Sequence, residues 1–245
     1  MLSFIVPAYN EEFELPATLE AIRVAAQDRE HEIIVADDGS TDRTAVVARE
    51  AGAKLISIRR RQIAAARNAG GRAAIGDVLF FVDADTQINQ AHVTGAIAAV
   101  ETGDSGGSAR IIKSGEIPTW WRICLKDSCA VYFGLNLGAG AFLFTTRKNF
   151  DAVGGFDESL FIGEEVYFSL ALGKLGRFRI LTEPIITSGR KLRMYSAREI
   201  LADLFGVLLR GPSVASSRDH LDIWYDGKRE TGSAFANSLP RNKPT

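Results

Sequence analysis

The sequence has little cysteine, no long hydrophobic run and no excess charge of either sign. Cys124 and Cys129 are its two cysteines, and no zinc-ligand spacing surrounds them, which argues against a disulfide framework and a structural zinc site. No apolar stretch reaches the ~18 residues that span a bilayer. The net charge of −1 gives no overall positive field, so we expect no nucleic-acid partner. The first residues are strand-like and leave no room for a signal peptide, so we expect a cytoplasmic protein.

Apolar runs alternate with helical patterns through the first third of the chain. We expect strands at 2–6, 32–36, 54–58 and 77–82, and helices from 16, after 41, and over 63–74. Ser40 or Thr41 can cap the second of these helices. Short connections between them predict an α/β domain with a Rossmann-like, mostly parallel sheet and helices on both faces. A hydrophobic content of 46% and a charged content of 24% fit such a globular domain.

The second part of the chain is less regular. We expect a helix from Asn89 to Val100, strands at 109–112, 138–145 and 177–181 (the last closed by Glu183-Pro184), and a C-terminal helix over 196–210. The stretch 117–136 is rich in tryptophan and phenylalanine. It is either a core helix or a surface that meets a lipid at the inner face of a membrane.

Two carboxylates follow the most apolar strand. Phe80 to Val82 run directly into Asp83 and Asp85, which can lean toward one point and share a cation such as Mg²⁺ or Mn²⁺. The same pattern also fits an ordinary turn in which aspartate caps a helix. The neighbouring strand end carries another pair, Asp37 and Asp38, whereas the connections at the opposite edge carry no paired carboxylates. Because ligands of parallel sheets bind at the carboxyl ends of the strands, this asymmetry favours a site.

Three further groups of residues are candidates for this site. Glu164 and Glu165 begin a helix, where the dipole alone also favours acidic residues. Gly138 and Gly140 would let a ligand approach the backbone closely. The basic stretch at 190–193 is either a solvated loop or a phosphate clamp.

The motifs at 4–11, 35–42, 65–68, 83–85 and 154–165, taken in this order, resemble family 2 glycosyltransferases. The resemblance covers about residues 2–185 and implies the GT-A fold, a nucleotide-diphospho-sugar donor, a divalent metal and inversion at the anomeric carbon. It divides the domain expected at 1–212 into a nucleotide-binding half, 1–88, and an acceptor-binding half, 89–212. A polar tail, 213–245, would follow.

The resemblance also implies roles for individual residues. The nucleoside pocket would be lined by Pro7, Ala8, Tyr9 and Glu11. One carboxylate of Asp37 and Asp38 would accept a hydrogen bond from the base, which the N3–H of uracil could supply, and Arg67 would help to hold the nucleotide. Asp83 would face the ribose or metal-bound water, and Asp85 would bind Mn²⁺ or Mg²⁺. Apart from the resemblance, which has no firm motif at these positions, the basic residues Arg190 and Arg193 could close over the diphosphate.

The expected general base departs from the family pattern. The family usually has the aspartate of a Glu-Asp pair where this chain has Glu165, and an acidic residue where it has Tyr167. We expect Glu165 to be the base, with Glu164 as a helper or structural anion. The Gln-x-x-Arg-Trp signature of processive members is missing, which predicts transfer of a single sugar.

Several functions compete on the sequence. A glycan, a small molecule and a lipid-linked polyprenyl phosphate are the alternative acceptors. A catalytically weak domain that binds nucleotide-sugar or scaffolds a partner is the non-enzyme alternative, and Glu165 with Tyr167 is its best support. A sugar-nucleotide-forming nucleotidyltransferase and a dinucleotide oxidoreductase are disfavoured, because neither a basic glycine-rich loop nor a glycine fingerprint follows the first strand.

Overall fold

The computed structural model describes residues 1–114, 138 and 140–188, and a single twisted sheet organises this part of the chain. The strands are β1 (Leu2–Ala8), β2 (His31–Asp37), β3 (Lys54–Ser57), β4 (Val78–Val82), β5 (Thr86–Gln87), β6 (Gly106–Ser114), β7 (Phe142–Thr146) and β8 (Phe178–Ser188). Their order across the sheet is β3-β2-β1-β4-β7-β6-β8-β5. The strands β3, β2, β1 and β4 are mutually parallel, and β6 is parallel to β8. The predicted mostly parallel α/β sheet is confirmed.

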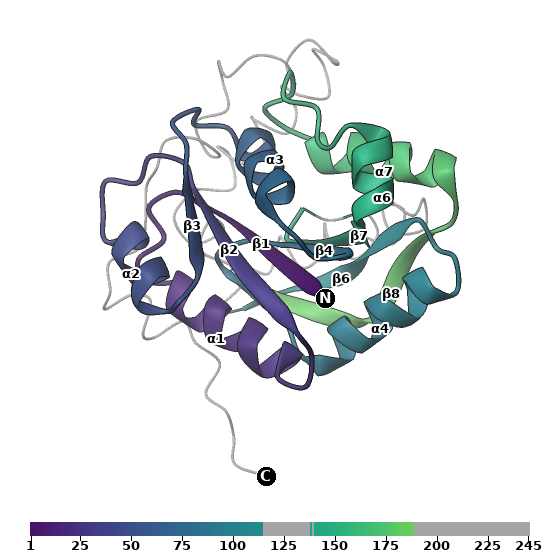
Figure 1. The fold of residues 1–245 in the computed structure, drawn as a ribbon, viewed down its shortest axis with the longest axis horizontal. Helices are drawn as coiled ribbons and strands as arrows, with labels where there is room; N and C mark the ends of the chain where they lie inside the picture. The colour runs from purple at the N-terminus through teal and green to yellow at the C-terminus, as the bar shows by residue number, and fades with distance from the viewer. Residues whose placement is uncertain (115–137, 139, 189–245) are drawn as a thin grey trace, which may run out of the picture.

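Helices cover both faces of the sheet, as Figure 1 shows. The helices are α1 (Leu15–Ala26), α2 (Thr44–Glu50), α3 (Ile63–Ala73), α4 (Gln90–Glu101), α6 (Arg147–Val153) and α7 (Glu164–Leu175). The helices α1, α2 and α4 pack on one face, and α3, α6 and α7 on the other. A hydrophobic cluster lies on each face of the sheet, and successive side chains of β1 belong to alternate clusters. Phe4 and Val6 pack in the cluster under α1, and Ile5 packs in the cluster under α3.

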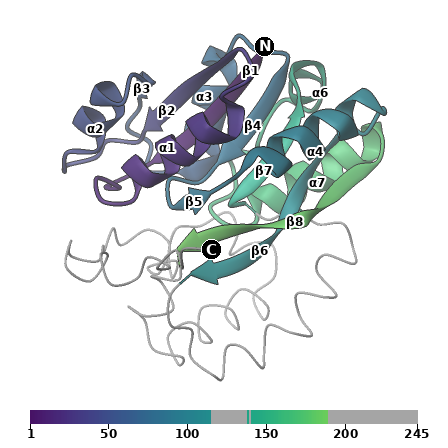
Figure 2. The ribbon, with the colours of Figure 1, turned by 90° about the horizontal axis from the view of Figure 1, so that it is seen from below.

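The change from parallel to antiparallel strand pairing at β7 brings segments that are distant in the sequence to one edge of the sheet. β7 is antiparallel to β4, and Val82 at the end of β4 pairs with Phe142 at the start of β7. The segment just before β7 therefore lies beside the residues that follow β4. β6 and β8 run side by side on the far side of β7, which Figure 2 shows clearly.

Two predicted element ends are wrong for local reasons. Strand β8 continues past Glu183-Pro184 to Ser188, because a register shift between Ala109 and Ile111 of β6 lets the ladder resume beyond the proline. Helix α2 is not capped by Ser40 or Thr41, since its N-cap residue is Arg43. The predicted cap of α4 is confirmed: the Asn89 side chain accepts the N–H groups of Ala91 and His92.

Some predictions fall on residues that the structure does not describe. These are the stretch 117–136, the C-terminal helix at 196–210 and the tail at 213–245, so the proposed limits 1–212 of the domain stay predictions. Over the described ranges, no helix has the length and apolar character needed to cross a membrane.

Helix α3 approaches β1 so closely that it needs glycine there. A Cβ atom built on Gly70 would lie 2.4 Å from the Cγ2 atom of Ile5. We expect Gly70→Ala to lower the free energy of unfolding by about 1–3 kcal/mol through overpacking. Gly173→Ala in α7 is the matched control, because nothing lies within 4 Å of its added Cβ. It should raise stability by about 0.5–1 kcal/mol through helix propensity. Urea unfolding of both variants measures the contrast, and equal effects would contradict the packing argument.

Candidate active site

Hydrogen bonds tie together the loops that follow β1 and β2. The Asn10 backbone N–H donates to Ser40 Oγ (2.9 Å), and the Asn10 side-chain oxygen accepts the Thr41 N–H (2.8 Å). The Glu11 N–H donates to Thr44 Oγ1 at 2.7 Å. Asn10 itself has a left-handed backbone with φ of 52°, which these bonds support. One rigid rim is thus built from the ends of two neighbouring strands.

The residues predicted to line a nucleoside pocket stand on this rim. Pro7 and Ala8 are the last two residues of β1 and are buried, Tyr9 follows them half-buried, and Glu11 is buried. They therefore share one edge of the sheet with Asp37, the last residue of β2. Their predicted contacts with a nucleotide stay predictions.

The two aspartates at the end of β2 have different tasks. Asp38 Oδ1 accepts the backbone N–H groups of Arg60 (2.7 Å) and Arg61 (2.8 Å), and its Oδ2 accepts that of Gln62 (2.6 Å). The Asp38 carboxylate therefore holds the loop between β3 and α3. Asp37 Oδ1 accepts the Ser40 N–H at 3.2 Å. Of the two aspartates, Asp37 is the better candidate to accept a hydrogen bond from a nucleobase.

Asp83 and Asp85 lie where β4 ends, next to the segments that precede β7 and end β8. The Asp83 N–H donates to the carbonyl of Ala141, and Asp83 Oδ1 accepts from Arg67 Nη2 at 2.9 Å. Asp85 Oδ1 accepts from Thr187 Oγ1 at 3.2 Å. The two carboxylates that follow β4 are therefore held at one edge of the sheet, Asp83 by Arg67 and Asp85 by Thr187 of β8.

The donor set suits a hard divalent cation that completes its shell from a ligand. Carboxylate oxygens are preferred by Mg²⁺ and Mn²⁺, and one or two carboxylates plus substrate phosphates are a common arrangement for Mg²⁺. Among the described residues there is no cluster of three or more metal-ligating side chains. Asp83 and Asp85 could hold such an ion together with phosphate oxygens, but not as a closed protein cage.

Arg67, from α3, connects these carboxylates to the start of α7. Its side chain is 1% exposed. Nη1 donates to Glu164 Oε1 at 2.6 Å, and Nη2 donates both to Asp83 Oδ1 and to the carbonyl of Gly140 at 2.8 Å. The ring of Phe156 lies 5.3 Å from its guanidinium carbon. Burial opposes the charge, but the surrounding carboxylates, Asp83 foremost, outweigh it and raise the pKa of Arg67. These contacts make Arg67 an anchor for acidic side chains, and its predicted contact with a nucleotide stays a prediction.

Glu164 and Glu165 occupy the first turn of α7, which begins after Gly163. Glu164 is buried and pairs with Arg67. Burial and, next, the neighbouring Glu164 raise the pKa of Glu165 to about 8. A Cβ on Gly140 would lie 3.6 Å from the Glu165 carboxyl carbon and 3.0 Å from Arg67 Nη2. The structure therefore brings Arg67, Asp83, Gly140 and both glutamates together.

Gly138 does not belong to this group. The Gly138 N–H donates to Ser169 Oγ at 3.0 Å, and a Cβ on Gly138 would strike Ser169 and Leu143 in the core. Its small size thus serves packing. Arg190 and Arg193 lie outside the described residues.

The sequence did not predict the hydrogen bonds by which Asn68 and Gln62 join the two halves of the chain. The Asn68 amide of α3 donates to the Phe156 carbonyl and to Glu158 Oε1, and accepts the Phe156 N–H. The Gln62 amide donates to the carbonyls of Glu158 and Leu160. Asn68 could have been recognised from the sequence, because it ends the motif at 65–68, but nothing in the sequence indicated Gln62.

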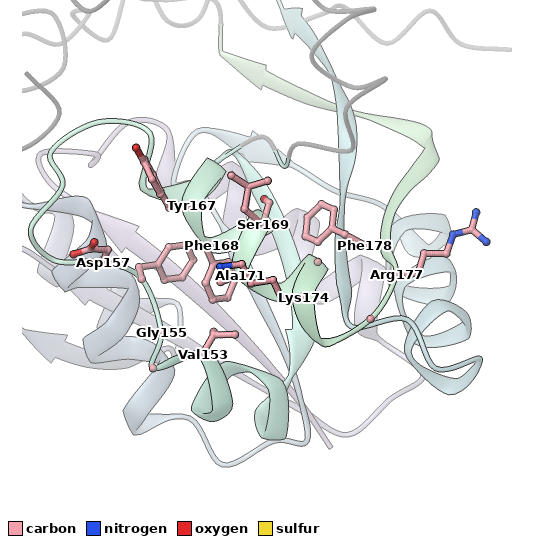
Figure 3. A pocket seen from close by; sticks show the side chains of 15 residues that line it. Val153, Gly155, Asp157, Tyr167, Phe168, Ser169, Ala171, Lys174, Arg177 and Phe178 are labelled. Atoms are coloured by element: carbon pink, nitrogen blue, oxygen red, sulfur yellow. The ribbon is translucent and has the colours of Figure 1, made fainter. Parts of the chain in front are cut away.

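A hollow of about 1030 Å³ lies along another side of α7. It is bordered by the turn at 153–157, by α7 and by Phe178, and Figure 3 shows Arg177 pointing away from the other labelled side chains. Within the described part of the chain, none of the predicted site residues lines it. The chemistry-bearing residues are at the sheet edge instead.

Removing the Arg67 charge should destabilise the protein strongly. Arg67→Met leaves the buried Glu164 carboxylate and the partly exposed Asp83 carboxylate without their cation, and we expect a loss of about 3–5 kcal/mol in the free energy of unfolding. Arg72→Met is the matched control on the same helix, because its pair with Glu158 is exposed and worth less than about 1 kcal/mol. Chemical denaturation compares them, and a similar loss in both would refute the central role of Arg67.

The comparisons with known proteins agree with this geometry. The model of glycosyl transferase family 2 matches residues 3–156. The dolichol-phosphate mannosyltransferase of Pyrococcus furiosus is 30% identical over 220 residues, which is 86% of this chain and 58% of that protein. The 4,4'-diaponeurosporenoate glycosyltransferase of Staphylococcus haemolyticus is 38% identical over 103 residues, 39% of this chain and 27% of that protein. The chain thus spans about a quarter to three fifths of the length of these relatives.

Solved structures share the fold at low sequence identity. S. aureus TarS 1-349 in complex with UDP-GlcNAc has a TM-score of 0.60 at 19% identity, covering 91% of this chain and 69% of that one. The mannosyltransferase PcManGT from Pyrobaculum calidifontis, in complex with GDP-Man and Mn²⁺, also has a TM-score of 0.60 at 19% identity, covering 86% and 64%. The sheet and its helices therefore form the GT-A fold of glycosyltransferases, as the sequence predicted. With the family model matching well over half of its length, this chain belongs to glycosyl transferase family 2.

Proposed function

We propose that the protein transfers a single sugar from a nucleotide-diphospho-sugar, preferably a UDP-sugar, to an acceptor hydroxyl, with inversion and with a divalent metal. The observation that carries the proposal is the convergence on Arg67 of Asp83, at the expected metal position, and of the acidic start of α7. Arg67 thereby ties the carboxylate that we propose to bind the metal to Glu164, which directly precedes the candidate base Glu165.

Each residue has a defined task in this reaction. Asp83 and Asp85 would hold the metal, which supplies charge stabilisation to the departing nucleotide diphosphate. Glu165 would take the proton of the acceptor hydroxyl as its oxygen attacks the anomeric carbon. Arg67 and Glu164 keep Asp83 and the first turn of α7 at a fixed separation. The small Gly140 leaves room beside the Glu165 carboxyl group.

The acceptor class is the second part of the proposal. A polyprenyl phosphate, which would take the sugar on a phosphate oxygen instead of a hydroxyl, is the alternative acceptor. It is supported by the P. furiosus relative, whose name specifies dolichol phosphate and which matches most of this chain. Several shorter matches are to undecaprenyl-phosphate 4-deoxy-4-formamido-L-arabinose transferases, one of them from Aeromonas hydrophila. Transfer to polyprenyl phosphate would place the enzyme peripherally at a membrane. Labelled sugar that partitions into organic solvent would indicate this acceptor, and water-soluble product a glycan or small molecule.

The donor and the metal are tested by calorimetric titration of UDP and GDP, with Mn²⁺ and then with EDTA. We expect tight UDP binding that EDTA abolishes, because the diphosphate and the two aspartates share the ion. Asp85→Ala should lose the metal-dependent part of the binding. Asp77→Ala is the control, since Asp77 is an exposed carboxylate at the opposite end of β4. Nucleotide binding in EDTA equal to that in Mn²⁺ would refute the metal site, and a preference for GDP would change the expected nucleobase of the donor from uracil to guanine. No binding of either would favour the non-catalytic alternative.

The base is tested by Glu165→Gln, which should lower kcat by about 10²–10⁴-fold and leave nucleotide affinity unchanged. Glu165→Asp keeps a carboxylate and should lose less. Because the pKa of Glu165 is raised to about 8, its ionised fraction grows as the pH rises toward that value. The value of kcat/KM should therefore increase about tenfold per pH unit below pH 8 and level off above it. A profile that is level from pH 6 upward, or full activity of Glu165→Gln, would place the base elsewhere.

A further inference from the structure

Arg61, in the loop between β3 and α3, has an unusual conformation and an unusual neighbour. Its φ is 50°, in the left-handed region that residues with side chains rarely adopt. Its guanidinium carbon lies 3.4 Å from the centroid of the Tyr9 ring, which is van der Waals contact of two flat groups. Neither feature is needed for the packing of the sheet, since the loop lies at its edge.

The strain at Arg61 is maintained by Asp38. The buried Asp38 carboxylate accepts the backbone N–H groups of Arg60, Arg61 and Gln62. The side chain of Gln62 is in turn anchored on the carbonyls of Glu158 and Leu160. The backbone of Arg61 is therefore fixed on both sides, and strained residues held in this way cluster at ligand-binding sites.

The order of the strands decides which part of a nucleotide Arg61 can meet. Along the carboxyl edge the sequence of strands is β3-β2-β1-β4. Asp83 and Asp85 follow β4 at one side, Tyr9 follows β1 in the middle, and Arg61 follows β3 at the other side. A nucleotide whose diphosphate lies at Asp83 and Asp85 must extend its base across β1, toward Asp37 and Arg61.

We propose that Arg61 is a base-binding residue, whose guanidinium rests on Tyr9 and stacks against the base of the donor nucleotide. This inference rests on the proposed function, because it assumes a nucleotide donor. A planar guanidinium supported by an aromatic ring offers a flat, polarisable platform, and bases stack well on both arginine and aromatic side chains. Tyr9 then acts as the support for this platform.

Arg61→Gly removes the guanidinium without harming the loop, because glycine adopts a φ of 50° without strain. We expect an unchanged or higher melting temperature, and affinities for UMP and UDP that fall by the same factor, about 5- to 150-fold. Arg61→Lys keeps the charge but not the plane and should also weaken binding. Arg60→Ala is the matched control: it removes the same charge one residue away, from an exposed side chain paired with Glu158 at 3.7 Å. Its affinity should equal that of the wild type.

Three results would overturn the inference. Unchanged affinity of Arg61→Gly would show that Arg61 does not touch the nucleotide, and tighter binding would show that it competes with the base for Tyr9. A loss for UDP without a loss for UMP would make it a phosphate contact. If the wild-type protein binds none of the uridine and guanosine nucleotides, the proposed donor itself fails. If the wild type binds a nucleotide and Arg61→Gly binds it equally well, only the inference about Arg61 fails.

Discussion

The buried cation of Arg67 is the interaction on which the site depends. It comes from a helix of the first half of the chain and reaches Asp83 after β4, Gly140 before β7 and Glu164 at the start of α7. Three segments, the farthest of them 97 residues from Arg67 in the sequence, are thereby fixed at one point. Burying an arginine with carboxylates gains little net stability, but once the group is buried its loss is costly. The arrangement is therefore better understood as specifying positions than as a source of stability.

Helix α3 carries almost all of this organisation. Its Gly70 lets it lie against β1, its Arg67 orients the acidic residues, and Asn68 fixes the turn before α7. The aromatic core continues under this helix, since Phe156 stacks on Phe168 with ring centroids 4.0 Å apart and also lies under Arg67. Packing and electrostatics thus act on the same few residues, and a change in one alters the other.

A raised pKa at Glu165 fits a site that is only completed by its substrates. Burial and, next, the neighbouring Glu164 disfavour the ionised form of its carboxyl group, and Arg67 opposes this effect. The pKa of the candidate base is therefore set by the same group of charges that Arg67 holds together. Hydrogen bonds from Gln62 and Asn68 to Glu158, in the segment before α7, also connect the first half of the chain to the second.

The sequence by itself determined the β/α alternation, the sheet edge and the acidic strand end, because hydrophobic periodicity and strand-terminal carboxylates are local properties. Motif order along the chain was sufficient to indicate the family. The partners of Arg67, the structural task of Asp38 and the anchoring by Gln62 were decided by the tertiary structure. Those contacts join residues from 16 to 98 positions apart, and no local pattern encodes which side chain a buried charge or amide will meet. The antiparallel insertion of β7 beside β4 settles that question, since it sets Gly140 and α7 against Arg67.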